Sequence, residues 1–300
     1  MMPQGIDIVF LGTAGSVPTK ERSMPSVAVI YDGSILLFDC GEGTQIQMLK
    51  YGLNAQRLKA IFISHIHGDH TIGIAGIVRS LAINGRKEAL SIFVPRGSER
   101  IIRSLIVFDR VTIGYPINII GVRQGTVYRG RGFSVSAFRL NHTVETYGYA
   151  VAEDSKLRFI KERCDRLGIR GTMYSELEKK GIIRINGKGI RLKGITRLQE
   201  GRKIVYATDT RPAAGTVRAA RGADLLIHEA SYKSSEKALA VSRKHSTSEE
   251  AAGIARKAKV SKLTITHFSA RYRDASQLLS EAKAVFKNTI AASDGYRITL

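Results

Sequence analysis

The chain has 300 residues, of which 43% are hydrophobic and 24% charged, and this composition excludes a disordered protein. It has no apolar run of about 18 residues, no signal-peptide pattern and only two cysteines, which argues against a membrane-spanning helix and a disulfide scaffold. We therefore expect a cytoplasmic protein with no membrane partner. The formal net charge of +21 predicts a polyanionic partner, chiefly nucleic acid.

Short apolar runs bounded by turn residues predict strands through much of the first half. They lie at Ile6–Leu11, Ser26–Tyr31, Ser34–Phe38 and Ala60–Ile63. Asp32 and Gly33 separate the second run from the third, and this dipeptide favours a tight hairpin turn. A helix is expected over Gly43–Tyr51.

Strands and helices alternate in the last third of the chain. Strands are predicted at Lys203–Tyr206, Leu225–Ile227 and Lys262–Thr266, and helices at Ser246–Lys259 and Ala275–Phe286. Ser246 or Ser248 is expected to cap the first of these helices. Mixed strands and helices in both halves predict an α/β protein built in layers.

One segment differs from the rest in charge. Asp154–Lys203 contains 15 Lys and Arg residues against 6 Asp and Glu residues, and it is rich in glycine and poor in long apolar runs. We interpret it as a basic arm inserted into a single domain that spans residues 1–300. Charge alone is equally compatible with a solvated loop.

The densest set of potential metal ligands follows the predicted strand Ala60–Ile63. His65, His67, Asp69 and His70 lie within six residues of one another. In an extended segment the alternation of side chains puts His65 and His67 on one side. Gly68 is expected to turn the backbone sharply, so that Asp69 and His70 face a second position. Imidazole and carboxylate groups suit Zn²⁺, with Mn²⁺ or Fe as alternatives.

Three later residues also follow strand-like runs and can complete this site. They are His142, Asp209 and His267. If the strand ends meet at one edge of a sandwich, one metal would be held by His65, His67 and His142 and the other by Asp69, His70 and His267, with Asp209 bridging them. Each of the three later residues, taken singly, is equally compatible with a structural role.

The order His-x-His-x-Asp-His, then His, Asp and His, resembles the metallo-β-lactamase superfamily, and more narrowly the tRNase Z family. Four local segments carry the narrower resemblance: Phe38–Gln45, Pro18–Ser23, His228–Ser231 and the stretch that begins at His245–Thr247. Ser23 and Ser231 stand where the family has Asn and Thr. The arm sits where the family inserts its tRNA-binding exosite, with Gly171-Thr172 near the place of a common Gly-Pro pair.

The resemblance implies an αββα sandwich with two Zn²⁺ per subunit at one edge. It implies an endoribonuclease that removes the 3′ trailer from precursor tRNA and leaves a 3′-hydroxyl on the tRNA. Asp69 would accept a proton from water, and His245, oriented by Glu229, would contact the phosphate and help protonate the leaving oxygen. Lys20 and Arg22 would contact the substrate or shape their loop. The family also implies a homodimer.

Two other functions remain open from the sequence. One is a different hydrolase of the same fold, acting on a small phosphodiester, a sulfate ester or a lactone. The other is an RNA-binding protein with a vestigial site. The basic arm argues against the first, because a small substrate does not require it. The full set of seven candidate ligands argues against the second.

Overall fold

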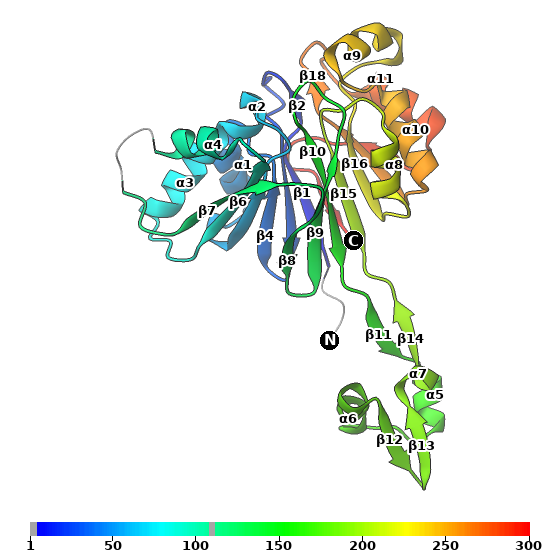
Figure 1. The fold of residues 1–300 in the computed structure, drawn as a ribbon. Coiled ribbons are helices and arrows are strands. Elements are labelled where there is room, and N and C mark those ends of the chain that lie inside the picture. The colour runs from blue at the N-terminus through cyan, green and yellow to red at the C-terminus, as the bar shows by residue number, and fades with distance from the viewer. Residues whose placement is uncertain (1–4, 108–111) are drawn as a thin grey trace. The chain divides into compact units, whose positions relative to one another are not determined.

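The computed structural model describes residues 5–107 and 112–300. The chain forms two compact units, of which the smaller is Ala152–Arg202 and the larger contains the chain on either side of it (Figure 1). In the described residues, no helix is both long enough and apolar enough to cross a membrane.

The larger unit is built on two seven-stranded sheets. The first sheet has the order β20 (Arg297–Thr299), β1 (Asp7–Gly12), β3 (Ser26–Tyr31), β4 (Ser34–Phe38), β5 (Leu58–Phe62), β6 (Leu90–Pro95) and β7 (Ile117–Val122). The second has the order β19 (Thr289–Ala291), β17 (Lys262–Thr266), β16 (Leu225–Glu229), β15 (Lys203–Ala207), β10 (Tyr147–Glu153), β9 (Phe133–Arg139) and β8 (Gly125–Gly130). A short parallel pair, β2 (Ala14–Gly15) with β18 (Phe268–Ser269), lies beside them.

The two sheets pack face to face through an aromatic core. Phe38 and Phe62 of the first sheet lie among Tyr149 and Tyr206 of the second, with ring centroids 5.4 to 5.9 Å apart across the interface. These side chains alternate along their strands with apolar residues that face outward. Each sheet therefore has two apolar faces, and each outer face needs a covering layer.

Helices supply both covering layers (Figure 1). On the first sheet these are α1 (Thr44–Lys50), α3 (Gly73–Ile83) and α4 (Glu99–Ile106), whose apolar side chains join one buried cluster with that sheet. On the second they are α8 (Ala214–Ala220), α10 (Ser248–Ala258) and α11 (Ser276–Val285). The other helices in the described part of this unit are α2 (Gly68–Thr71), α9 (Lys237–Arg243) and the 3-10 turns η1 (Ala55–Arg57) and η2 (Ser234–Glu236). The predicted αββα sandwich is confirmed.

The predicted hairpin is also present. Asp32 and Gly33 have φ angles of 48° and 71°, which is the left-handed backbone that a tight turn between twisted strands requires. The strands on either side, β3 and β4, have the predicted bounds.

The predicted cap of the helix near residue 246 was wrong. Helix α10 begins at Ser248, and its N-cap is Thr247, whose hydroxyl accepts the N–H of Glu250 while the Glu250 carboxylate accepts the N–H of Thr247. This reciprocal pair satisfies two amides that would otherwise lack partners. Ser246 and Ser248 instead direct their hydroxyls to the Thr210 carbonyl and the Glu281 carboxylate.

The smaller unit has its own core. It contains two antiparallel strand pairs, β11 (Lys156–Phe159) with β14 (Thr196–Gln199) and the hairpin β12 (Ile182–Ile185) with β13 (Lys188–Arg191), and the helices α5 (Lys161–Arg166), α6 (Met173–Lys180) and α7 (Leu192–Ile195). Buried Cys164, Ile169, Leu177, Ile183 and Ile195 pack together. All its lysines and arginines except Arg158 and Arg202 are exposed.

Candidate active site

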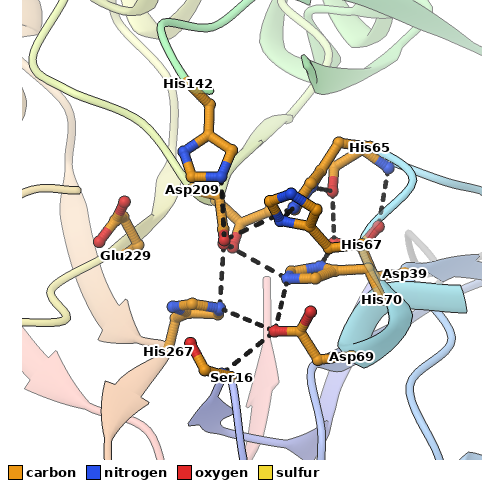
Figure 2. A network of polar contacts seen from close by, with 12 residues as sticks. Ser16, Asp39, His65, His67, Asp69, His70, His142, Asp209, Glu229 and His267 are labelled. Carbon is orange, nitrogen blue, oxygen red and sulfur yellow. Dashed lines mark hydrogen bonds and ion pairs between the residues drawn. The ribbon is translucent and has the colours of Figure 1, made fainter. Parts of the chain in front are cut away.

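The predicted ligands meet at the carboxyl ends of strands from both sheets (Figure 2). His65 follows β5 of the first sheet, whereas His142, Asp209 and His267 follow β9, β15 and β17 of the second. Asp209 and His267 have φ angles of 48° and 60°, so the chain turns abruptly where each strand ends. Parallel strands end at the same edge of a sheet, which explains why residues so far apart in sequence converge.

The segment after His65 turns in a different way from the predicted one. His67 has an extended backbone and caps the single helical turn α2, which begins at Gly68 and carries Asp69 and His70. The change of direction thus comes from the start of a helix. A left-handed glycine is not used at this point, since Gly68 is not among the residues with positive φ.

Asp209 lies between two groups of side chains. Its Oδ1 is 3.0 Å from His267 Nε2 and 3.4 Å from His70 Nε2, and its Oδ2 is 3.6 Å from His65 Nε2 and 3.9 Å from His142 Nε2. The ligand atoms of His65, His67, His142 and Asp209 lie within 4.8 Å of one another, and so do those of Asp69, His70 and His267. The geometry therefore brings together all seven predicted residues, and His245 forms a third such group with Asp209 and His267.

In two of the histidines a hydrogen bond at Nδ1 determines which nitrogen can bind a metal. His70 Nδ1–H donates to Asp39 Oδ2 at 2.8 Å, and His142 Nδ1–H donates to the Lys244 carbonyl at 3.1 Å. Neither acceptor has a proton to give, so the neutral form of each ring carries its hydrogen on Nδ1 and presents its Nε2 lone pair to the space around Asp209. Burial lowers the pKa of His70, but Asp209 and Asp39 raise it well above its usual value, so metal binding at His70 would release a proton.

These residues fit a divalent cation. The Nε2 atoms of His70, His142 and His267 are buried, and in the described residues they make no well-aligned hydrogen bond, with carboxylate oxygens of Asp69 and Asp209 at 3.0 to 3.9 Å as their polar neighbours. Burial would raise the pKa of Asp209, but the neighbouring His267 and His70 hold it well below its usual value, so its carboxylate is ionised. Buried lone pairs that converge on an ionised carboxylate form the donor set that Zn²⁺ prefers.

A second group of polar residues adjoins the cluster around His245. The Nδ1–H of His245 donates to Glu229 Oε1 at 2.9 Å, and Glu229 also accepts the Thr210 N–H at 2.6 Å and the Ser231 hydroxyl at 2.7 Å. Burial lowers the pKa of His245, but the charge and the hydrogen bond of Glu229 raise it to about 9. The ring is therefore a cation at neutral pH. Its centroid is 5.1 Å from that of His142.

Lys20 and Arg22 differ in their surroundings. Lys20 is exposed, on the loop that follows Ser16, whose N–H donates to Asp69 Oδ2 at 3.1 Å. The Arg22 guanidinium donates to Thr13 Oγ1 at 2.7 Å and to the Ala292 carbonyl at 3.0 Å. It also lies 4.6 Å from the centroid of the Phe268 ring. These contacts support loop shaping, the second of the two roles that the sequence left open for Arg22.

The sequence did not predict several residues that support the cluster. Asp39 accepts from His70, from the N–H and the hydroxyl of Ser64 at 2.7 and 2.9 Å, and from the Tyr206 hydroxyl at 2.8 Å. At Gly15 an added Cβ would lie 2.7 Å from His267 Nδ1. A signal existed for Asp39, since it directly follows a buried strand, but its partners come from residues up to 167 positions away.

The chain resembles known proteins over nearly all of its length. Residues 6–161 match the family model described as Anti-Pycsar protein Apyc1, so this half of the chain belongs to that family. A ribonuclease Z from Archaeoglobus fulgidus is 42% identical over 293 residues, which cover 96% of this chain and 95% of that protein. The chain belongs to the ribonuclease Z family.

Solved structures agree with this assignment. The short form of human tRNase Z superposes on this ribonuclease Z with a TM-score of 0.71 and 26% identity, over 97% of this chain and 98% of that one. The metallo-β-lactamase fold protein YhfI from Bacillus subtilis, at 19% identity and a TM-score of 0.73 over 99% of this chain and 100% of that one, shows the shared fold alone. The predicted family and fold are confirmed, and the protein is a hydrolase of the endoribonuclease class.

Proposed function

We propose that this ribonuclease Z removes the 3′ trailer from precursor tRNA by hydrolysing one phosphodiester bond, with two Zn²⁺ ions per subunit, and leaves a 3′-hydroxyl on the tRNA. The names of its relatives support the substrate. The observation that carries the chemistry is the convergence of histidine and carboxylate ligands from both sheets on Asp209 (Figure 2).

The seven residues divide into two sets of ligands. His65, His67 and His142 would hold one ion, Asp69, His70 and His267 would hold the other, and Asp209 would contact both. When bound, Zn²⁺ supplies Lewis acidity, which lowers the pKa of water from about 15.7 to roughly 7 and offsets the charge of the phosphate.

The chain itself supplies the proton transfers. Hydrolysis that leaves a 3′-hydroxyl breaks the bond between phosphorus and the 3′ oxygen, and this oxygen needs a proton as it departs. His245 is suited to donate it, because Glu229 keeps the ring protonated at neutral pH. Burial would raise the pKa of Asp69, but His70 holds it below its usual value, so Asp69 is an ionised proton acceptor beside the reaction centre.

The basic unit gives the enzyme a surface for folded RNA. Its exposed lysines and arginines are suited to phosphate contacts, which position RNA without reading its bases. Such contacts release counterions, so substrate affinity would fall steeply with salt. We assign to this unit the binding of tRNA outside the cleavage site, with Lys20 as a further contact near the cut.

The direct test is incubation with a precursor tRNA that carries a 3′ trailer, with and without a chelator. We expect one metal-dependent cut, a 3′-hydroxyl on the tRNA and a 5′-phosphate on the released trailer. Cleavage of small phosphodiesters without any cleavage of precursor tRNA would favour the alternative hydrolase. Binding of tRNA without cleavage at any metal concentration would favour the RNA-binding protein.

Two further parts of the proposal concern the setting of the enzyme. We propose a homodimer, as the family implies, and sedimentation of the metal-loaded protein with and without tRNA tests it. We also propose a cytoplasmic enzyme, where both cysteines, which are free and buried, stay reduced. Fractionation of cells that produce the tagged full chain tests this placement.

A further inference from the structure

Each of the two proposed metal positions takes ligands from both sheets. The segment that follows β5 supplies His65, His67, Asp69 and His70, and the second sheet supplies the remaining three residues. The spacing of the sheets near this edge therefore determines whether either set of ligands can close around an ion. Zinc–nitrogen distances allow little error, because they are close to 2.0 to 2.1 Å.

Most contacts between the sheets are apolar and do not fix a distance sharply. Phe38, Phe62 and their neighbours fill the interface, and such contacts have no preferred direction. Hydrogen bonds are directional, and three of them cross the interface next to the ligand segment. One joins the backbone, from the Tyr147 N–H to the Ser64 carbonyl at 2.9 Å, and the other two come from side chains. The hydroxyl of Tyr149 on β10 donates to the Ile63 carbonyl at 2.7 Å, and that of Tyr206 on β15 donates to Asp39 Oδ2 at 2.8 Å.

The two hydroxyls reach the ligands by different routes. Tyr206 holds Asp39, which accepts the Nδ1–H of His70, a member of the second set, and also accepts the Ser64 hydroxyl at 2.9 Å. Tyr149 holds the carbonyl of Ile63, directly before Ser64, whose hydroxyl lies 2.9 Å from His65 Nδ1. His65 belongs to the first set. Both tyrosines are buried, with exposed fractions of 0% for Tyr149 and 3% for Tyr206, so water does not compete for either bond.

We infer that Tyr206 and Tyr149 are positioning residues that set the distance between the two halves of the metal centre, Tyr206 through Asp39 for the set with His70 and Tyr149 through Ile63 and Ser64 for the set with His65. This inference rests on the proposed function only in that the cluster binds metal. It does not depend on the substrate.

The test replaces each tyrosine by phenylalanine, which keeps the ring in the core and removes only the hydroxyl. Tyr31→Phe is the matched control. Tyr31 also joins the two sheets, because its hydroxyl donates to the Gly132 carbonyl at 3.4 Å and its ring centroid is 4.9 Å from that of Phe133. Ser26 is the first residue of β3 and contacts Asp39, whereas Tyr31 is the last residue of the same strand. Tyr31 therefore lies at the end of β3 that is away from the ligand segment.

Zinc affinity and stoichiometry are measured by competition with a chromophoric chelator, and the visible spectrum of the Co²⁺-loaded protein reports ligand geometry. We expect Tyr206→Phe and Tyr149→Phe each to lower the affinity for one of the two zinc ions by about tenfold. This is the lower end of the effect of losing a residue that holds a metal ligand in place. Each should also change the Co²⁺ spectrum. Tyr31→Phe should leave the zinc affinity and the Co²⁺ spectrum unchanged, although this variant also loses a hydrogen bond between the sheets.

Double variants identify which ion each tyrosine serves. Tyr206→Phe should add less to the loss caused by His267→Ala than to the loss caused by His142→Ala, because Asp39 contacts His70 directly and reaches His65 only through Ser64, and residues that act on one site do not behave additively. Tyr149→Phe should show the reverse pattern. A Tyr206→Phe protein with wild-type zinc affinity and spectrum overturns the inference, as does an equal loss in Tyr31→Phe.

Failure of the proposed function has a different signature. A wild-type protein that binds two zinc ions but leaves precursor tRNA intact refutes the substrate, while the tyrosine variants still decide the inference. A wild-type protein that binds no zinc in the competition assay refutes the metal centre and the inference together.

Discussion

At the scale of single residues, the site depends on which proton each side chain carries. Asp39 and the Lys244 carbonyl hold the hydrogens of His70 and His142 on Nδ1, so in the neutral, metal-binding form of each ring the Nε2 lone pair faces the cluster. Glu229 accepts the Nδ1–H of His245 in the same way, and its charge and hydrogen bond raise the pKa of that ring to about 9. His245 is not one of the seven predicted ligands, so in the proposal its ring keeps this proton.

The role of His245 predicts a specific loss. His245→Ala should retain two zinc ions and its affinity for precursor tRNA but lose turnover by about 10² to 10⁴-fold, the usual effect of removing a general acid. His267→Ala is the contrast, since it should lose metal as well. Metal analysis, filter binding and single-turnover cleavage separate the two variants, and loss of zinc from His245→Ala would contradict the assignment.

Gly15 offers a second test at this scale. A Cβ at Gly15 would lie 2.7 Å from His267 Nδ1 and 3.1 Å from the His267 carbonyl oxygen, so the histidine must move. Gly15→Ala should lower the zinc affinity by about tenfold, which is in the range observed when the contacts that position a metal ligand are disturbed. Gly253→Ala in α10 is the control, because its Cβ would meet nothing within 4 Å. Equal zinc affinity of the two variants in a chelator competition would refute the prediction.

At the scale of elements, the ligands and His245 lie where strands end and helices begin. The loop with His245 leads into α10, whose first turn is held by the capping box of Thr247 and Glu250. Arg211, two residues after Asp209, donates to the same Glu250 carboxylate at 2.7 Å and to the His245 carbonyl at 2.5 Å. One helix cap thus connects the ends of two elements that meet at the site.

This cap predicts a pH-dependent stability. Burial would raise the pKa of Glu250, but hydrogen bonds from Arg211 and from the Thr247 amide lower it below its ordinary 4.5. A depressed pKa contributes stability above the unfolded-state value, and the contribution is lost as the pH falls through the folded-state value. Glu250→Gln should therefore cost about 1 kcal/mol of unfolding free energy at pH 7 and less at pH 4.

Urea unfolding of the metal-free protein at the two pH values measures this difference. Glu249→Gln is the control, because Glu249 is exposed in the same first turn and keeps only the interaction with the helix dipole. It should change the stability by a few tenths of a kcal/mol. A Glu250→Gln cost that is the same at both pH values would show that the charge of Glu250 does not matter.

At the scale of the whole molecule, the reaction centre and the basic surface belong to separate compact units. The chain enters and leaves the smaller unit side by side, since the Glu153 N–H donates to the Arg202 carbonyl at 2.9 Å and the Arg202 guanidinium pairs with the Glu153 carboxylate at 2.9 Å. The unit can therefore be removed without separating β10 from β15, its neighbour in the sheet.

A shortened enzyme tests this division. Replacing Asp154–Gly201 by two glycines should lower the cleavage of precursor tRNA by about two orders of magnitude at moderate salt, because the phosphate contacts are lost. Hydrolysis of bis(p-nitrophenyl) phosphate should stay within about twofold, since that substrate makes no such contacts. The full chain is the control, and its tRNA affinity should fall steeply with salt. Equal loss of both activities would refute a separable binding unit.

The sequence by itself determined several strands and helices of the larger unit, the seven candidate ligands and the basic insertion. Local patterns carry this information: apolar runs for β3, β4 and β17, a dense histidine motif for residues 65–70, and a local excess of lysine and arginine. Only the tertiary structure decided the supporting contacts. Tyr206 meets Asp39 across 167 positions, and Arg22 turns inward onto Phe268, because two separate sheets pack face to face. Such contacts depend on the packing of distant segments, and no spacing along the chain encodes them.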